Sequence, residues 1–387
     1  MDSQVTITTN TNIPRVRNRV IVCMDGTWDT PSERTNVYYL YLHLNMPEGK
    51  LGKGDKKEDP EQDQWRQVAG YFEGVGTTQN KYLGGLFGLG LSNQIMKAYE
   101  FISRHYENED DEIWIFGFSR GAYAARSLAG MIYNVGLLPD EHIETQAPEA
   151  YNCTAAEMKQ SIQRKRSPSI SALSINAWNP KLDSWAVLIQ LVLLVFHNYP
   201  GTLVDQPVIW TLFHERNSFH DIRISPKVKS AFHALSIHEQ RAWFTPALMD
   251  FGLKQREDQE LEQIWFPGMH SDIGGQAEGS RLLPNQSLRW MMTKAADRGL
   301  KFTRTIDEIC NEGGFYYQDS YESSLIYQIV SREDRVIDPS MFSPKGLAAL
   351  YKDGQFEQFI EPEQLALYKS KTHHNYINSI KHLISGK

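Results

Sequence analysis

The sequence predicts an α/β fold in which a mostly parallel sheet is covered by helices on both faces. Three apolar runs, at residues 19–24, 67–73 and 112–118, each end in a glycine-containing turn. Helix-forming segments separate these runs. Strands that lack polar alternation are typical of parallel sheets, because the crossover helices bury both faces. The turns that follow such strands meet at one edge of the sheet, where reactive groups gather.

The remaining elements follow in chain order. Apolar residues at helical spacing predict helices at Ser92–Tyr106 and Ala122–Val135. The glycine-rich run Gly84–Gly90 predicts a mobile segment or a tight turn. The apolar stretch Ala186–Phe196 fits either a central strand or a buried helix, since its periodicity does not distinguish them. Further expected elements are a helix over 235–241, a short strand over 263–266 and a helix over 287–298.

We expect one catalytic domain at residues 18–300, with two flanking segments. Residues 1–17 are polar and predict a disordered or arm-like start. Residues 138–184 are polar and irregular, which indicates an insertion or lid within the domain. Residues 301–387 carry no motif and are expected to form a C-terminal extension packed on the same domain.

Composition excludes several classes of function. The 387 residues carry a formal net charge of −7 without a basic block, which argues against nucleic-acid binding. The longest apolar stretch, 186–196, is shorter than the ~20 residues that span a bilayer, so we expect no stable membrane insertion. The N-terminus has no apolar region of the secretory kind. We therefore expect a cytoplasmic protein.

No cofactor motif is found in the sequence. The 3 cysteines are far apart and lack C-x-x-C spacing, which argues against a disulfide framework or a zinc site. The run Gly84–Gly90 is not followed by Gly-Lys-Ser/Thr, so a phosphate-binding P-loop is not expected. We predict neither a metal nor an organic cofactor.

The most informative motif is Gly117-x-Ser119-x-Gly121, which ends an apolar strand and directly precedes a helix. That arrangement is typical of a nucleophile elbow, a turn so sharp that only glycine fits beside the serine. The competing interpretation is a glycine-rich turn whose serine caps the following helix. The elbow predicts Ser119 as a covalent nucleophile.

A serine nucleophile needs a base and two N–H donors for the oxyanion. Of the 12 histidines, His270 is the best candidate base, because it follows a short strand in a glycine-flanked turn downstream of Ser119. The backbone N–H of Arg120 is the first expected donor. The second is expected from Gly26 or Thr27, after the first strand.

Several motifs together resemble one family. Cys23–Asp29, Tyr71–Thr77, Gly117–Arg126 and Trp265–Gly275 are similar, in order, to motifs of an α/β-hydrolase family long known as a domain of unknown function. That family includes phospholipase effectors of bacterial type VI secretion and many fungal members. The resemblance implies a three-layer α/β-hydrolase fold, Ser119 as nucleophile, His270 as base, and lipid or other ester substrates.

The chain departs from this family at the triad acid. Members follow the strand after the elbow helix with Val-Trp-Asp-Thr, whose aspartate is the acid, whereas the matching position here reads His197-Asn198. Loss of the triad aspartate costs about 10⁴ in rate in serine proteases, so another carboxylate is expected or the chemistry differs. Asp205 is the leading substitute, because it lies shortly after that strand.

Three other carboxylates are weaker candidates for the same role. Asp221 and Glu239 lie in segments that match the family, and both are expected to be structural. Asp272 lies two residues beyond His270, outside the usual order of triad residues but close in space.

The sequence thus predicts a serine hydrolase that acts on an ester, thioester, lactone or lipid. One alternative is a non-hydrolytic lyase, isomerase or cyclisation step in a biosynthetic pathway, with an altered acid. Another is a descendant that only binds. The expected partner is a small-molecule or lipid substrate, and the sequence leaves the oligomeric state open.

Overall fold

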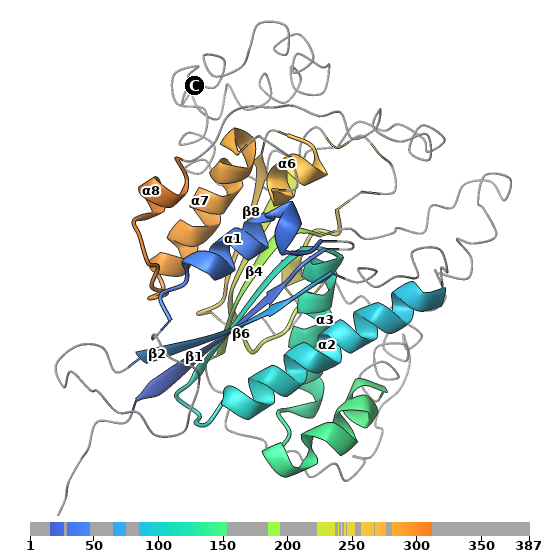
Figure 1. Cartoon of the computed structure of the whole chain (residues 1–387). Helices are drawn as coiled ribbons and strands as arrows, with labels where there is room; N and C mark the ends of the chain where they lie inside the picture. Colours follow the sequence, from blue (N-terminus) through green and yellow to red (C-terminus); the bar gives the residue numbers. More distant parts are fainter. Residues whose placement is uncertain are drawn as a thin grey trace, which may run out of the picture.

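A computed structural model of the chain shows a parallel sheet between two layers of helices (Figure 1). The sheet has six strands in the order β2-β1-β3-β4-β6-β8. The described residues are 16–26, 29–46, 65–74, 85–152, 185–193, 223–236, 239, 241, 244, 246–251, 257–266, 268–275 and 281–311.

Every neighbouring pair of strands in this sheet is parallel. All strands therefore end at the same edge, which gathers the turns that follow them. A separate two-stranded sheet pairs β5 (Arg223–Ile224) with β7 (Asp250–Phe251). The strands of the main sheet are β1 (Arg17–Met24), β2 (Trp65–Phe72), β3 (Glu112–Ser119), β4 (Trp185–Leu193), β6 (Val228–Ser236) and β8 (Glu260–Phe266).

Helices cover both faces of the sheet. Figure 1 shows α2 and α3 on one face and α1, α6 and α7 on the other. The helices are η1 (Pro31–Glu33), α1 (Asn36–His43), α2 (Gly85–His105), α3 (Arg120–Val135), η2 (Asp140–His142), α6 (His270–Gly274), α7 (Leu282–Ala296) and α8 (Ile306–Ile309). Among the described residues, no helix combines the length and the apolar character that crossing a membrane requires.

Alternate residues of the central strands feed two separate cores. On β1, Val20 and Val22 pack in the core beneath α2 and α3. Ile21 and Cys23 point the other way, into the core shared with α1 and α7. All four are fully buried. An apolar residue at every position is what a strand buried on both faces requires, which confirms the predicted parallel α/β arrangement.

The structure decides between strand and helix for two segments of the chain. The stretch 186–196 contains a central strand, β4, which pairs with β3 and β6. The helix expected over 235–241 is wrong at its start. Leu235 and Ser236 end β6 and pair with Trp265 and Phe266 of β8. Apolar burial within the sheet outweighs the helical spacing in this short segment.

Of the two alternatives expected at Gly84–Gly90, the tight turn is wrong, because α2 begins at Gly85. Glycine in a helix interior costs up to about 1 kcal/mol relative to alanine. The later turns of α2 offset this cost by burying Ile95, Tyr99 and Ile102.

The flanking segments are described only in part. Residues 143–152 are helical, and Ile143, Ala147 and Ala150 join the core beneath α2 and α3. This part of the expected insertion is therefore packed, while 153–184 lies outside the described residues. Of the C-terminal segment only 301–311 is described, and it includes α8, whose Ile309 is buried in the core shared with α7. Residues 1–15 also lie outside the described part.

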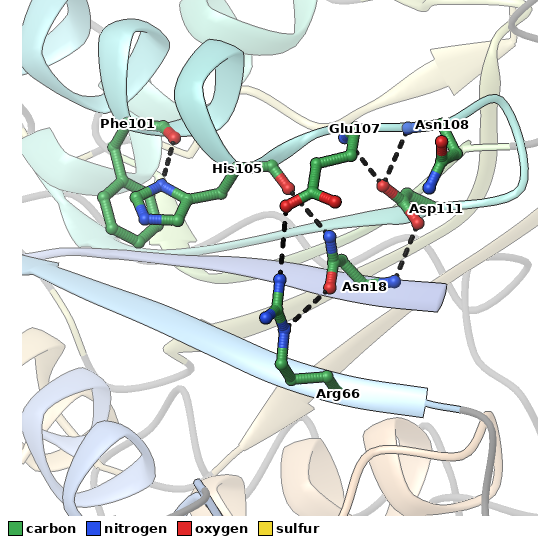
Figure 2. Close-up of polar contacts among 7 residues, drawn as sticks. All are labelled: Asn18, Arg66, Phe101, His105, Glu107, Asn108 and Asp111. Atoms are coloured by element: carbon green, nitrogen blue, oxygen red, sulfur yellow. Dashed lines mark hydrogen bonds and ion pairs between the residues drawn. The ribbon is translucent and has the colours of Figure 1, made fainter. Parts of the chain in front are cut away.

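A buried carboxylate fixes the end of the sheet at which the strands begin (Figure 2). Asp111, just before β3, accepts the backbone N–H groups of Asn18 at 2.7 Å, Glu107 at 2.8 Å and Asn108 at 2.9 Å. Its side chain is fully buried. One aspartate thus joins the start of β1 to the loop between α2 and β3.

The side chain of Asn18 extends the same network to β2 (Figure 2). Its amide donates to the carbonyl of His105 at 3.2 Å, and its carbonyl accepts from Arg66 Nε at 2.9 Å. Arg66 also pairs with Glu107 at 3.3 Å, although this pair is exposed and contributes little. Two strands and the end of α2 are therefore held together by polar contacts of the buried Asn18.

We predict that Asp111→Ala destabilises the fold. The change leaves three backbone N–H groups without their charged acceptor, and hydrogen bonds to charged groups contribute about 1.5–3 kcal/mol each before relaxation. We expect a loss of roughly 3 kcal/mol or more in the free energy of unfolding, measured by urea titration. The control is Asp110→Ala, the same change at the exposed preceding residue. Equal stabilities for the two variants would contradict the role of Asp111.

Candidate active site

Ser119 occupies the turn between β3 and α3. It is the last residue of β3, and α3 begins at Arg120. Its backbone angles are φ 54° and ψ −123°. Arg34 is the other non-glycine residue of positive φ in the described part of the chain. Such conformations cost about 1–3 kcal/mol and persist where the surrounding structure imposes them, often at active sites.

The two flanking glycines explain how this turn closes. A Cβ on Gly117 would lie 2.5 Å from the carbonyl oxygen of Gly121. A Cβ on Gly121 would lie 2.2 Å from the carbonyl oxygen of Met24, at the end of β1. Any side chain at either position would push α3 away from the sheet. The start of α3 therefore lies directly against the end of β1.

The loop after β1 approaches the serine. A Cβ on Gly26 would lie 3.0 Å from Ser119 Cβ. The loop is held by the buried Asp25, whose Oδ1 accepts the N–H of Gly26 at 2.9 Å. Asp25 Oδ2 accepts the hydroxyls of Thr35 at 2.5 Å and Tyr71 at 2.6 Å. Burial raises the pKa of Asp25 to about 6, although these hydrogen bonds oppose the rise.

This geometry bears on the expected oxyanion donors. The Gly26 N–H points to Asp25 Oδ1, so an oxyanion would have to compete with that bond. Thr27, the alternative donor, lies outside the described residues. Arg120 is the first residue of α3, where backbone N–H groups have no acceptor within the helix and favour negative charge. The role of Arg120 as an oxyanion donor stays a prediction.

Gln94 of α2 ties together the loops that follow β1 and β2. Its side-chain amide lies 3.1 Å from the carbonyl of Asp25 and 2.9 Å from that of Glu73. The N–H of Gly74 donates to the carbonyl of Asp29 at 3.0 Å. The loops after β1 and β2 are thus held together by the Gln94 side chain and by a backbone hydrogen bond.

His270 lies at the same edge of the sheet as Ser119. It lies four residues after the end of β8, as the first residue of α6, and is 5 % exposed. Its ring stacks on Phe118, the residue before the serine, with ring centres 4.9 Å apart. The ring of Phe244 meets it edge-on at 5.3 Å. The structure therefore brings the neighbourhoods of the predicted nucleophile and base together.

Asp272 caps the helix on which His270 lies. Its Oδ2 accepts the N–H of Met269 at 2.8 Å, while its Oδ1 has no hydrogen-bond partner among the described residues. Burial, with a smaller contribution from the charge of Glu239, raises the pKa of Asp272 to about 7. The carboxyl group therefore gains and loses its proton near neutral pH.

Glu239 is a buried carboxylate beside the same turn, and sequence reasoning assigned it only a structural role. It pairs with Arg241 through two contacts, Oε1 to Nε at 2.8 Å and Oε2 to the terminal nitrogen at 2.7 Å. Its Oε2 also accepts the backbone N–H of His270 at 3.3 Å. The available signal in the sequence was its position, soon after a strand and between Ser119 and His270.

Other predicted site residues are not placed. Asp205, the leading candidate for the acid, lies outside the described residues, as do His197, Asn198 and Asp221. Within the described part of the chain, no group of three or more His, Cys, Asp or Glu residues has the geometry to hold a metal ion.

These observations define a class: a parallel α/β domain with a serine at a strained strand–helix turn and a histidine at the same sheet edge. A family model described as the catalytic domain of Tle1-like phospholipase effectors of type VI secretion matches residues 18–294. The chain belongs to this family. The matched region contains both Ser119 and His270, and the match confirms the resemblance to type VI effectors that the motifs indicated.

The individual proteins that are similar to this chain match it at low identity or over part of their length. The uncharacterized protein YEL023C of Saccharomyces cerevisiae is 36 % identical over an alignment of 138 residues that covers 31 % of this chain and 18 % of the yeast protein. The structure of the Tle1 effector bound to the VgrG spike from the type 6 secretion system aligns at 16 % identity with a TM-score of 0.35, over 71 % of this chain and 55 % of that one. An uncharacterized protein from Pseudomonas aeruginosa aligns at 16 % identity and a TM-score of 0.36, over 76 % and 47 %. The chain thus spans about half the length of these structures and about a fifth of the yeast protein.

We predict that Asp272→Asn makes the protein less sensitive to rising pH. The folded-state pKa of Asp272, about 7, lies above the ordinary value of 3.8, so folding disfavours the ionised form. Wild-type stability should therefore fall between pH 5 and 7, by up to about 1.4 kcal/mol per unit. The substituted amide keeps an acceptor for the Met269 N–H without this cost.

The measurement is urea unfolding of both proteins at pH 5 and pH 8. Asp140→Asn, at an exposed aspartate on η2, is the control and should follow the wild-type slope. If Asp272→Asn leaves the pH dependence unchanged, the ionisation of this carboxyl group does not lower the free energy of unfolding.

Proposed function

We propose that this protein is a lipid hydrolase that cleaves a carboxylic ester through a Ser119 acyl-enzyme, with His270 as general base. The observation that carries the proposal is the conformation of Ser119. A positive φ at a serine between a buried strand and a helix, with glycines pressed against neighbouring backbone, is the geometry of a nucleophile elbow. The family's description as phospholipase effectors supports a lipid substrate.

The proposed fold is the three-layer α/β-hydrolase fold. Its support is the parallel sheet, the helices on both faces, and the positions of the site residues on it. The elbow follows the central strand β3, the neighbouring loop follows β1, and the histidine follows β8 at the edge of the sheet. In hydrolases with this elbow, one oxyanion donor follows the nucleophile and the other comes from an earlier strand's loop.

The proposed reaction proceeds in two halves. Ser119 Oγ attacks the ester carbonyl while His270 takes the hydroxyl proton, and the Arg120 N–H stabilises the resulting oxyanion. The protonated His270 then donates its proton to the departing alcohol, which leaves an acyl-enzyme. Water, activated by His270, attacks the acyl group and frees Ser119. Asp205 stays a predicted orienting acid for His270.

We predict that Ser119→Ala abolishes ester hydrolysis. Removing the serine of a catalytic triad lowers kcat by roughly 10⁴- to 10⁶-fold, because the oxyanion site and binding supply the remainder. Activity is measured on short-chain nitrophenyl esters and on phospholipid vesicles. Ser127→Ala, the same change farther along α3, should retain the wild-type rate.

A fluorophosphonate probe separates this mechanism from its rivals. Folded wild-type protein should be labelled at Ser119, and both Ser119→Ala and His270→Ala should lose the label. An unlabelled but folded wild-type protein would exclude the acyl-enzyme and favour a non-hydrolytic or binding role. Turnover of small esters without any release of fatty acid from vesicles would exclude the lipid substrate alone.

A further inference from the structure

A base such as His270 needs a partner that fixes its orientation. In Ser–His–Asp enzymes the acid holds the imidazole in the correct tautomer and stabilises the imidazolium. Phe118 contributes a stacked face to the His270 ring, but an apolar ring does not select a tautomer. If the proposed function holds, some polar group must anchor the turn that carries His270.

Glu239 lies where the fold would place such a group. It follows β6 by three residues, and β6 is the neighbour of β8, from which His270 extends. The last residues of the two strands, Ser236 and Phe266, are paired. The order Ser119, Glu239, His270 along the chain also matches the order of nucleophile, acid and base in elbow hydrolases.

The carboxylate of Glu239 contacts the backbone of His270 directly. Its Oε2 accepts the His270 N–H at 3.3 Å, across 31 residues of sequence. Glu239 is 2 % exposed, so this acceptor works away from water, where a charged hydrogen bond is stronger. The position of the first residue of α6 is therefore tied to one buried side chain.

Arg241 extends the same contact to the imidazole ring. Its guanidinium holds both carboxylate oxygens of Glu239 and lies 3.5 Å over the ring of Phe244. Phe244 in turn meets the edge of the His270 ring. The Glu239–Arg241 pair thus contacts the backbone N–H of His270 directly and the His270 ring only through Phe244.

We propose that Glu239, held by Arg241, is the positioning residue of His270 and takes the orienting role that a triad acid has in Ser–His–Asp enzymes. This inference rests on the proposed function, and it assigns to Glu239 the role for which the sequence favoured Asp205. Because the positive charge of Arg241 offsets the negative charge of Glu239, the effect on His270 is mainly geometric. Misplacement of a catalytic group by about 1 Å costs roughly 10²-fold in rate.

The first test is Glu239→Gln, which keeps an acceptor but loses the charge that holds Arg241. We expect kcat for ester hydrolysis to fall roughly 10²-fold while KM changes little, the pattern of a lost transition-state interaction. Glu239→Asp, which keeps the charge, should recover part of the rate. Glu262→Gln is the matched control, because it breaks another glutamate ion pair, with Lys294, on the strand leading to His270.

A second variant guards against loss of folding. Glu239→Gln alone leaves Arg241 buried without its partner, which is strongly destabilising. The double variant Glu239→Gln/Arg241→Met removes both charges together, and circular dichroism checks that it is folded. The kcat of the double variant should fall as it does in Glu239→Gln. A folded double variant with wild-type kcat would overturn the proposal.

A readout without turnover separates this inference from the proposed function. Nitrogen-15 histidine NMR of the full chain, with His270→Gln to assign the signal, reports the tautomer and pH titration of the ring. We expect the ring signals to move in Glu239→Gln, because the ring shifts with its backbone, and to stay as in the wild type in Glu262→Gln, whether or not any ester is hydrolysed. If Asp205→Asn moves the His270 signals and Glu239→Gln does not, the acid is Asp205 and the proposal fails.

Discussion

The close contact between the β3–α3 turn and the end of β1 is the constraint on which the site depends. A Cβ on Gly121 would lie 2.2 Å from Met24 O, so the helix can start here only without side chains in the gap. Ser119, which closes this turn, has φ 54°, and packing elsewhere must offset the strain. The fully buried apolar residues of β1 and β3 on both faces of the sheet supply that packing. The nucleophile position is therefore a consequence of a rigid sheet, not of a flexible loop.

Buried carboxylates fix the loops at the edge where the strands end. Asp25 holds the N–H of Gly26, Asp272 holds that of Met269, and Glu239 holds that of His270. Each replaces water for a backbone donor that regular secondary structure leaves unpaired. Burial raises the pKa of Asp25 to about 6 and that of Asp272 to about 7, so two of these anchors change charge near neutral pH. Stability and site geometry are thereby linked to pH through the same groups.

The turn at Ser119 and the place of His270 after a strand could be predicted from the sequence, because the signals for them are local. The strand before Ser119, its flanking glycines and the following helix all lie within one short segment, and His270 follows a strand in a similar way. The prediction for the end of β6 was wrong because the pattern near Leu235 suits a helix, and only pairing with β8 decides for a strand. The contact between Glu239 and His270 joins residues 31 positions apart, and no local pattern encodes it. Asp205 stays a prediction, since it lies outside the described residues.

The departure at His197-Asn198 becomes less costly if orientation of the base is distributed over several contacts. A triad acid restrains the imidazole through one hydrogen bond, whereas here Phe118 restrains one face of the ring and Phe244 its edge. Glu239 restrains the backbone, and Arg241 couples that restraint to Phe244. Aromatic contacts contribute about 0.5–1.5 kcal/mol each beyond burial, comparable to a neutral hydrogen bond. What they do not supply is a charge that stabilises the imidazolium, and the Glu239–Arg241 pair, whose charges offset each other, supplies it only weakly.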